Sequence, residues 1–246
     1  MADASELQGH TAIVTGGSRG IGLATAIALC SEGVDVLVCG RSPDALDRAV
    51  SRIRSETGVS TAGRVASVVA DVRRPEQAER MVESAVRELG GVDILINNAG
   101  IGRFKPLSEL TVEDWRETVE TNLSGVFHCC RASIPAMRKQ KGGWIINVSS
   151  LAGKHPFAGG TAYCASKAGL NALTESLMQE VRHEGIRVSC VLPGSVNTEF
   201  AGSEITAEAC WKLAAADVAQ AIIDLLRHPL RSLPSRVELR PSMPGK

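Results

Sequence analysis

The only tyrosine of this chain, Tyr163, stands four residues before Lys167. On a helix, residues four apart share a face, so the lysine ammonium can lie beside the phenol. A free phenol titrates at about pH 10, which is too high for proton transfer at neutral pH, but an adjacent cation lowers that pKa. The pair can then exchange a proton with a carbonyl or alcohol oxygen. Because a Tyr-x-x-x-Lys spacing is common on surface helices and usually inert, this prediction needs further residues.

Ser150 supplies a third suitable group. It follows the apolar run 144–148 and lies thirteen residues before Tyr163. Ligands bind outside the carboxyl ends of parallel strands, so a serine there can hydrogen-bond the reacting oxygen. Ser149 is the alternative for this role. The serine, tyrosine and lysine together predict acid–base chemistry at a carbonyl or alcohol.

A glycine-rich loop indicates a second ligand. The residues Thr15-Gly16-Gly17-Ser18-Arg19-Gly20-Ile21-Gly22 follow a strand-like run and lead directly into an Ala- and Leu-rich helical segment. Glycines allow a sharp turn and a close backbone approach, and a helix N-terminus attracts the charge of a pyrophosphate. Tight strand–helix turns also use glycine for geometry alone. At this place in the chain, we interpret the loop as a dinucleotide site.

The end of the second strand-like run indicates which dinucleotide binds. NAD-binding folds usually carry an acidic residue there for the ribose 2′-hydroxyl, about 20 residues past the loop. The window 39–42 contains no carboxylate but does contain Arg41, and Arg19 lies inside the loop itself. Guanidinium groups pair with a 2′-phosphate, so we predict NADP(H) as cofactor. The alternative is that both arginines are ordinary solvated side chains.

Two further strand ends carry candidate cofactor contacts. Asp71 and Val72 follow the third run and are placed to touch the adenine, although an Asp at a strand end often only caps a loop. After the fourth run, Asn97-Asn98-Ala99-Gly100 puts small residues at the expected cofactor crevice. A plain turn is the alternative for that segment.

Short apolar strand patterns alternate with helical ones along the whole chain. The predicted strands are 10–15, 34–39, 65–70, 92–96, 144–148, 186–192 and 236–240. The predicted helices are 21–32, 43–56, 75–89, 111–139, 161–183, 207–212 and 216–226, with Pro135 expected to kink or end the fourth. Strands that are apolar throughout and separated by helices predict a parallel sheet covered on both faces. We therefore expect one α/β Rossmann domain over residues 1–246, a doubly wound sheet of about seven strands.

Composition excludes several classes of function. The 246 residues carry 27 basic and 27 acidic side chains, which removes the simplest case for nucleic acid or an anionic membrane as partner. The N-terminal tail 1–9 holds charges and no apolar run, and no stretch reaches the roughly 20 apolar residues of a membrane span. The seven cysteines form no C-x-x-C pair, which favours reduced thiols in a cytoplasmic protein and no metal site.

These motifs together resemble the short-chain dehydrogenase/reductase family from about His10 to Phe200. The resemblance implies a catalytic tetrad of Asn122, Ser150, Tyr163 and Lys167, in which the tyrosine is the acid/base and the serine orients the carbonyl. It further implies that the lysine holds the nicotinamide ribose and lowers the tyrosine pKa, and that Asn122 keeps a water of the proton relay. Asn122 as a mere helix-bend residue is the alternative.

The resemblance also implies that the segment 193–198 wraps the nicotinamide. The predicted cofactor contacts are then Gly16, Ser18, Arg19, Gly20, Ile21, Gly22, Arg41, Asp71, Val72, Asn98, Ala99, Gly100, Tyr163, Lys167, Pro193, Gly194, Val196 and Thr198. Family members also use the helices 111–139 and 161–183 to associate, which implies a homotetramer or dimer. A short lid over 199–213 would border the substrate.

The substrate is a small carbonyl or alcohol compound in this interpretation. Within the family, the chain is similar to bacterial 3-oxoacyl-(acyl-carrier-protein) reductases and to NADP-dependent 3-hydroxy acid dehydrogenases. Arg138, Lys139 and Lys141 can offer a basic patch to an acidic carrier protein, but Glu184 would repel it. Lys154 and His155 can meet an anionic substrate or lie solvated in their loop. The alternatives from other classes are a non-catalytic dinucleotide sensor and a nucleotide-sugar epimerase or dehydratase.

Overall fold

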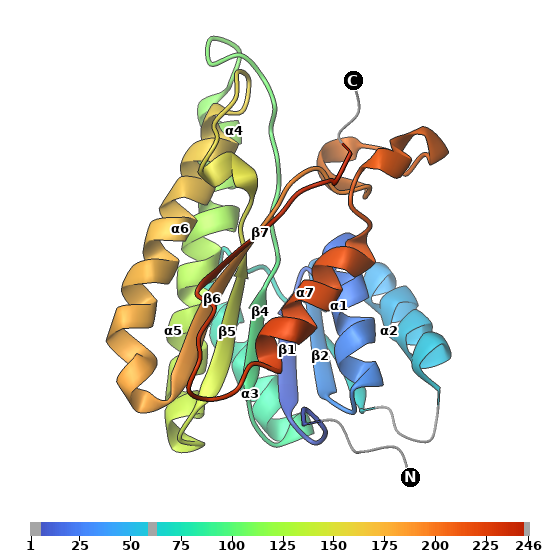
Figure 1. Cartoon of the computed structure of the whole chain (residues 1–246), viewed down its shortest axis with the longest axis vertical. Coiled ribbons are helices and arrows are strands. Elements are labelled where there is room, and N and C mark those ends of the chain that lie inside the picture. The colour runs from blue at the N-terminus through green and yellow to red at the C-terminus, as the bar shows by residue number, and fades with distance from the viewer. Residues whose placement is uncertain (1–5, 59–62, 244–246) are drawn as a thin grey trace.

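All seven strands join one parallel sheet in the computed structural model, which describes residues 6–58 and 63–243 (Figure 1). The strand order is β3-β2-β1-β4-β5-β6-β7, so the order reverses between β1 and β4. The strands are β1 (Thr11–Thr15), β2 (Asp35–Gly40), β3 (Val65–Val69), β4 (Ile94–Asn97), β5 (Gly143–Val148), β6 (Ile186–Pro193) and β7 (Arg236–Leu239). This confirms the doubly wound fold, with a ligand crevice expected where the order reverses.

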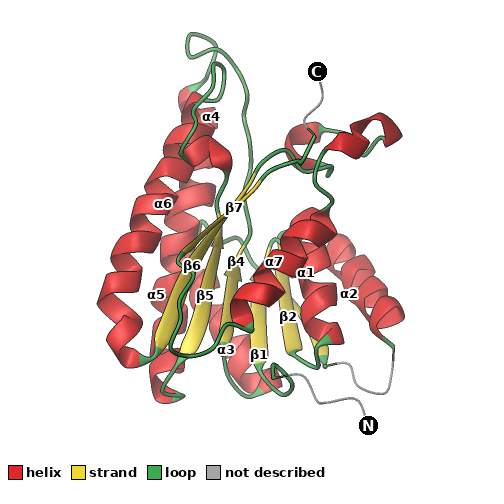
Figure 2. Cartoon of the chain, in the orientation of Figure 1, coloured by secondary structure: helices red, strands yellow, loops and turns green. Residues whose placement is uncertain are grey.

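Helices cover both faces of the sheet (Figure 2). On one side, α1 (Gly20–Ser31) contacts both α2 (Pro43–Thr57) and α7 (Ala215–Leu226). On the other side, α3 (Pro75–Leu89) contacts α5 (Gly125–Lys139). Helix α6 (Thr161–Val181) packs on β6 on that same side. Successive strand residues point to opposite faces. Val14 and Val38 therefore belong to one buried cluster, and their neighbours Ile13 and Leu37 to the other. Two buried faces explain why the strands are apolar throughout.

The predicted helix 111–139 is interrupted, but not at the proline. Helix α4 (Val112–Val119) begins with a capping box between Thr111 and Asp114, a π-helical turn follows over Glu120–Ser124, and α5 continues to Lys139. Pro135 lies inside α5, so the expectation that it ends the helix was wrong, whereas the expected kink stays a prediction. The wider π-turn places an extra residue in the helix at the segment facing the site, as such turns often do.

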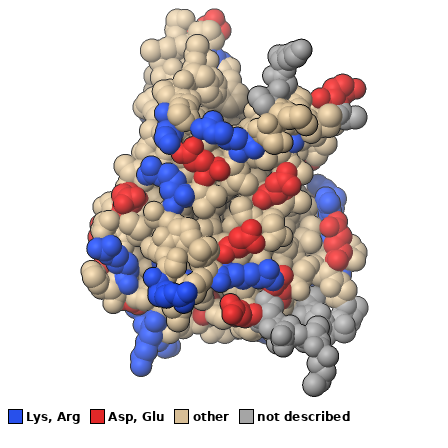
Figure 3. Space-filling view, in the orientation of Figure 1, with Lys and Arg blue, Asp and Glu red and all other residues tan. Residues whose placement is uncertain are grey.

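The remaining boundaries differ slightly from the sequence prediction. The predicted lid holds two short 3₁₀ turns, Phe200–Gly202 and Ala207–Trp211, and β7 stops at Leu239. Residues 1–5 of the predicted tail lie outside the described residues. In the described part of the chain, no helix has the length and apolar character needed to cross a membrane. Positive and negative side chains are interspersed over most of the face shown in Figure 3.

Candidate active site

The predicted residues meet in one cavity at the carboxyl ends of the central strands. The cavity is lined by the predicted residues Gly16, Ser18, Arg19, Gly20, Ile21, Arg41, Asp71, Val72, Asn98, Ala99, Gly100, Ser150, Tyr163, Lys167, Pro193, Gly194, Val196 and Thr198. Two predicted residues, Gly22 and Asn122, are not part of the lining. Segments from β1, β2, β3, β4, β5 and β6 thus converge on one site.

The glycine loop connects β1 to α1 and forms one wall of the cavity. Gly16 and Gly20 have φ of 62° and 54°, a region that disfavours other residues. Helix α1 has no side-chain cap and no acidic residue in its first turn, so its N–H groups are free for an anion. These features fit the pyrophosphate of a dinucleotide. Gly22 acts by packing, since a Cβ there would stand 2.3 Å from the Gly16 carbonyl oxygen.

Asn98 fastens this loop to the end of β4. Its side-chain amide donates to the carbonyl oxygens of Thr15 and Gly16 at 3.0 and 3.1 Å. In return the Thr15 hydroxyl accepts from the backbone N–H groups of Asn98 and Ala99, both at 3.0 Å. These bonds satisfy backbone groups where the strand ladder stops, and they fix the loop against the sheet.

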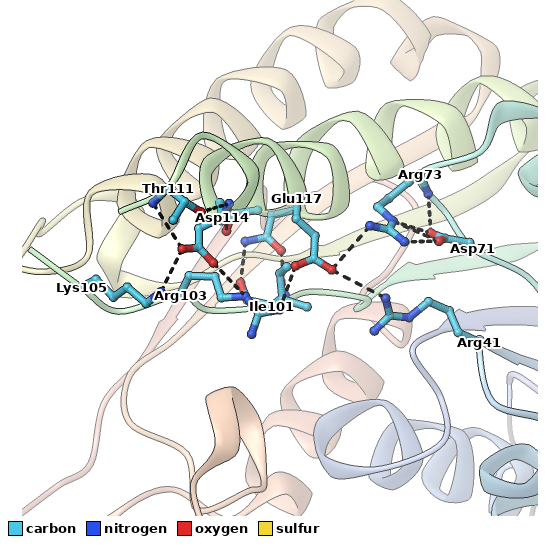
Figure 4. A network of polar contacts seen from close by, with 11 residues as sticks. Arg41, Asp71, Arg73, Ile101, Arg103, Lys105, Thr111, Asp114 and Glu117 are labelled. Atoms are coloured by element: carbon cyan, nitrogen blue, oxygen red, sulfur yellow. Dashed lines mark hydrogen bonds and ion pairs between the residues drawn. The ribbon is translucent and has the colours of Figure 1, made fainter. Parts of the chain in front are cut away.

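Beside the cavity, charged side chains that include Arg41, Asp71 and Arg73 form a network of polar contacts (Figure 4). Arg73 binds both oxygens of Asp71 at 2.6–3.0 Å, and this hydrogen bonding lowers the pKa of Asp71. The Arg41 guanidinium lies 3.9 Å from Glu117, and its side chain is 59% exposed. Asp71 therefore reaches the cavity with its charge compensated. Arg41 is held loosely and can turn toward a ligand.

Ser150 and Tyr163 line the other end of the cavity together, and hydrogen bonding by the serine acts to lower the pKa of the tyrosine. The Ser150 hydroxyl also accepts from the N–H of Ala152 at 3.1 Å, which orients it. Ser149 points elsewhere: its buried hydroxyl donates to Asn171 at 2.7 Å. The structure thus brings Ser150, and not its neighbour, to the tyrosine.

Burial determines the pKa values of the tyrosine and the lysine. The ammonium of Lys167 donates to the Val148 carbonyl oxygen at 2.8 Å and lies 5.9 Å from the centre of the Tyr163 ring. Desolvation lowers the pKa of Lys167 to about 8, and it raises the pKa of Tyr163 in spite of the hydrogen bond from Ser150. The expectation of a lowered tyrosine pKa was wrong for this structure, because burial raises the pKa more than the hydrogen bond from Ser150 lowers it.

Asn122 lies in the π-turn, fully buried. Its amide nitrogen donates to the Ile101 carbonyl oxygen at 2.9 Å and to the Ser166 hydroxyl at 3.0 Å, and its oxygen accepts from the Ile101 N–H at 2.8 Å. The side chain therefore joins the loop after β4 to helix α6. The expected water held by Asn122 stays a prediction.

Several residues at the site were not predicted. Ile101, Thr121 and Phe200 line the cavity, and so do Cys39 and Glu199. Their positions follow strand ends and the lid, which a sequence can locate only roughly. Lys154 pairs with Glu238 at 2.6 Å rather than standing free in its loop.

Comparison with known proteins agrees with this geometry. The family described as short chain dehydrogenase matches residues 10–209. The chain belongs to the short-chain dehydrogenase/reductase family. Its members are oxidoreductases that use NAD or NADP, and this places the present chain among them.

Two sequence relatives and two solved structures illustrate the range of this family. An uncharacterized oxidoreductase of Staphylococcus saprophyticus is 34% identical over 96% of this chain and 99% of its own. A 3-oxoacyl-(acyl-carrier-protein) reductase of Synechocystis is 37% identical over 79% of this chain and 77% of its own. One solved structure is an alcohol dehydrogenase of Thermococcus sibiricus with 5-hydroxy-NADP, and the other is a variant of actinorhodin polyketide ketoreductase with NADPH. Both have a TM-score of 0.87 and 29% sequence identity to this chain. Each match covers 96% of this chain and 98–99% of the solved chain.

Proposed function

We propose that this chain is an NADP(H)-dependent carbonyl reductase or alcohol dehydrogenase with Tyr163 as its acid/base. The observation that carries the proposal is that Ser150, Tyr163 and Lys167 line the same cavity as the glycine loop. A non-catalytic sensor would need only the loop. The serine, tyrosine and lysine supply the additional groups that reduction requires.

The proposed reaction uses each of these side chains at a defined atom. Bound NADPH would supply a hydride to the carbonyl carbon while the carbonyl oxygen takes the Tyr163 proton, so that the C=O π bond breaks. The products would be an alcohol, NADP⁺ and the Tyr163 phenolate, which a proton from solvent converts back to the phenol. Ser150 donates a hydrogen bond to the carbonyl oxygen and holds it near the phenol. Burial raises the pKa of Tyr163, so the phenol carries at neutral pH the proton that this step transfers. Lys167 holds the nicotinamide ribose beside them.

The preference for NADP(H) rests on Arg19 and Arg41. Both line the cavity, and the adjoining β2 ends in Gly40 instead of a carboxylate. Since a hydrogen bond to a charged group contributes about 1.5–3 kcal/mol, Arg41→Ala should lower kcat/KM for NADPH about 10- to 100-fold. The value for NADH should change little, because NADH has no 2′-phosphate. A wild type that prefers NADH would contradict the proposal.

Tyr163→Phe tests the catalytic step. The variant keeps the ring and its neighbours Phe104 and Phe200 but removes the proton donor. Carbonyl reduction, followed by NADPH absorbance, should fall at least about 100-fold. NADPH binding, followed by cofactor fluorescence, should persist and serves as the control for folding. Retained reduction by this variant would remove Tyr163 from the mechanism.

Reduction of 3-oxoacyl thioesters on a carrier protein is the second candidate, favoured by the likeness to the Synechocystis reductase. A carrier protein is acidic and would need a basic docking surface. Arg138 donates to both carboxylate oxygens of Glu184, which neutralises part of the proposed patch. Turnover confined to the carrier-protein thioester, with no activity on free ketones, would favour this candidate.

A further inference from the structure

The phenylalanines of this chain gather around the candidate catalytic tyrosine. The sequence has only four phenylalanines, and three of them form ring contacts in one cluster with Tyr163. The centroid of the Phe104 ring lies 5.5 Å from that of Tyr163 and 5.7 Å from that of Phe157, and Phe200 lies 5.6 Å from Tyr163. These are distances typical of packed aromatic pairs.

The three phenylalanines come from three separate segments and are not part of a buried core. Phe104 follows β4, Phe157 precedes α6, and Phe200 lies in the lid after β6. Phe104 and Phe157 remain 46% and 48% exposed, and Phe200 lines the cavity. An aromatic surface that stays open to solvent beside a reacting group is suited to bind an apolar ligand.

Backbone features hold these rings in place. A Cβ on Gly102 would stand 2.8 Å from the Phe104 ring and 2.9 Å from the Phe200 ring, and a Cβ on Gly160 would stand 2.7 Å from the Phe157 ring. The rings therefore pack on bare backbone. In addition, the N–H of Lys105 donates to the Gly159 carbonyl oxygen at 2.9 Å, which ties the first two segments together. The path of the loop backbone therefore helps to position the three rings.

The cations beside Phe104 are already paired. Lys105 binds Asp114 at 3.0 Å, and Arg103 binds Glu117 at 2.8 Å and approaches Asp114 at 3.7 Å (Figure 4). Their charges are thus compensated within the same loop and helix. An anionic substrate at the rings would have to compete with these carboxylates.

The other two segments also offer little to an anion. Lys154, near Phe157, is held by Glu238 at 2.6 Å, and the same carboxylate also binds Arg240 at 3.1 Å. In the lid, Lys212 lies over the ring of Trp211, whereas Glu199 lines the cavity and brings a negative charge. The surroundings of the cluster therefore favour a neutral ligand.

We propose that Phe104, Phe157 and Phe200 bind the body of the substrate, and that this substrate is an uncharged ketone or alcohol carried on an aromatic or alicyclic ring system. The rings would stack on the substrate while its oxygen reaches Ser150 and Tyr163. This inference rests on the proposed function, because it concerns the same reacting oxygen. It excludes short 3-oxo acids as good substrates.

The test compares three ketones with NADPH: 2-tetralone, which has a ring system, 2-butanone, which has none, and acetoacetate, which is anionic. We expect kcat/KM for 2-tetralone to exceed both others by about 100-fold, as two or three favourable ring contacts would give. Phe104→Leu and Phe157→Leu should each lower the ratio of kcat/KM for 2-tetralone to kcat/KM for 2-butanone by about tenfold.

Phe127→Leu is the matched control. Phe127 lies on α5, is 51% exposed and contacts His128 instead of the cluster, so this substitution should change none of the three values. Binding of 2-tetralone to the NADPH complex of Tyr163→Phe, measured by calorimetry, should persist and should weaken when Phe104→Leu is added. This readout does not depend on turnover.

The outcomes separate the two proposals. If acetoacetate or 2-butanone is reduced as well as 2-tetralone and the reduction depends on Tyr163, the proposed function holds and the aromatic surface is overturned. If Phe127→Leu lowers kcat/KM for 2-tetralone as much as Phe104→Leu does, the proposed aromatic surface is also overturned. If no ketone is reduced, or reduction survives in Tyr163→Phe, the proposed function itself fails.

Discussion

Replacing Lys167 by methionine should make the cofactor-free protein more stable at neutral pH while abolishing its proposed activity. The lysine side chain is 4% exposed, and burial lowers its pKa from 10.5 to about 8. One pKa unit corresponds to about 1.4 kcal/mol, so the charged form costs about 3 kcal/mol in the folded state. Methionine has similar length and carries no charge to desolvate.

The sign of the pH dependence follows from these two pKa values. Below about pH 8, the lysine is protonated in both the folded and the unfolded chain, and the cost is fully present. Between about pH 8 and 10.5, the unfolded chain binds a proton that the folded chain does not, so the free energy of unfolding of the wild type rises with pH. The stability gap to the variant should therefore narrow by about 3 kcal/mol across this window.

Urea unfolding of both proteins, in reductant and without cofactor, measures the gap at each pH. Loss of the hydrogen bond to the Val148 carbonyl oxygen offsets part of the gain by a constant amount and does not affect the slope. Lys154→Met, at a side chain that is 48% exposed, provides the control and should show no such narrowing. A gap that stays constant or widens toward high pH would refute the desolvation argument.

Three further substitutions test how the site is built. Ser150→Ala should lower kcat/KM for reduction about 100-fold, and loss of its cap on the Ala152 N–H should lower the free energy of unfolding by about 0.5–2 kcal/mol. Ser149→Ala should lower the free energy of unfolding by about 1–3 kcal/mol, because it removes the buried bond to Asn171, with little effect on activity. A 100-fold loss of activity in Ser149→Ala with an active Ser150→Ala would exchange the two roles. Gly22→Ala should lower the free energy of unfolding by about 1–3 kcal/mol and weaken NADPH binding, because the added methyl group would lie 2.3 Å from the Gly16 carbonyl oxygen. Urea unfolding measures the first effect, and titration with NADPH measures the second. Unchanged NADPH affinity would contradict the tight packing of the loop.

The sheet could be predicted from the sequence because its pattern is local. Each strand is a short apolar run, and each helix has a periodic pattern with recognisable ends, such as the Ser42 cap of α2. The glycine loop and the serine at the end of β5 also follow directly from strand positions. Residues tied to the carboxyl ends of strands therefore met in the cavity as expected.

Features that depend on the paths of loops could not be predicted. Phe104, Phe157 and Phe200 are far apart in the sequence and lie in irregular segments, so no periodicity connects them. The pairing of Asp71 with Arg73 depends on the turn between them, and the π-turn at 120–124 leaves no simple pattern. The spacing to Lys167 predicted a lowered pKa for Tyr163, but burial raises that pKa. Burial is a property of the folded chain and could not be read from the spacing.

The proposed catalytic groups also hold the ends of the strands together. Asn122 bonds both backbone groups of Ile101, Lys167 bonds the Val148 carbonyl oxygen, and Ser150 accepts from the N–H of Ala152. The Val148 carbonyl lies at the end of β5, where the strand ladder stops, whereas Ile101 and Ala152 lie in the segments that follow β4 and β5; in each case a side chain satisfies a backbone group. A substitution of such a residue removes chemistry and support at once. Activity losses at this site therefore assign a catalytic role only when the unfolding free energy and cofactor binding of the same variant are measured beside them.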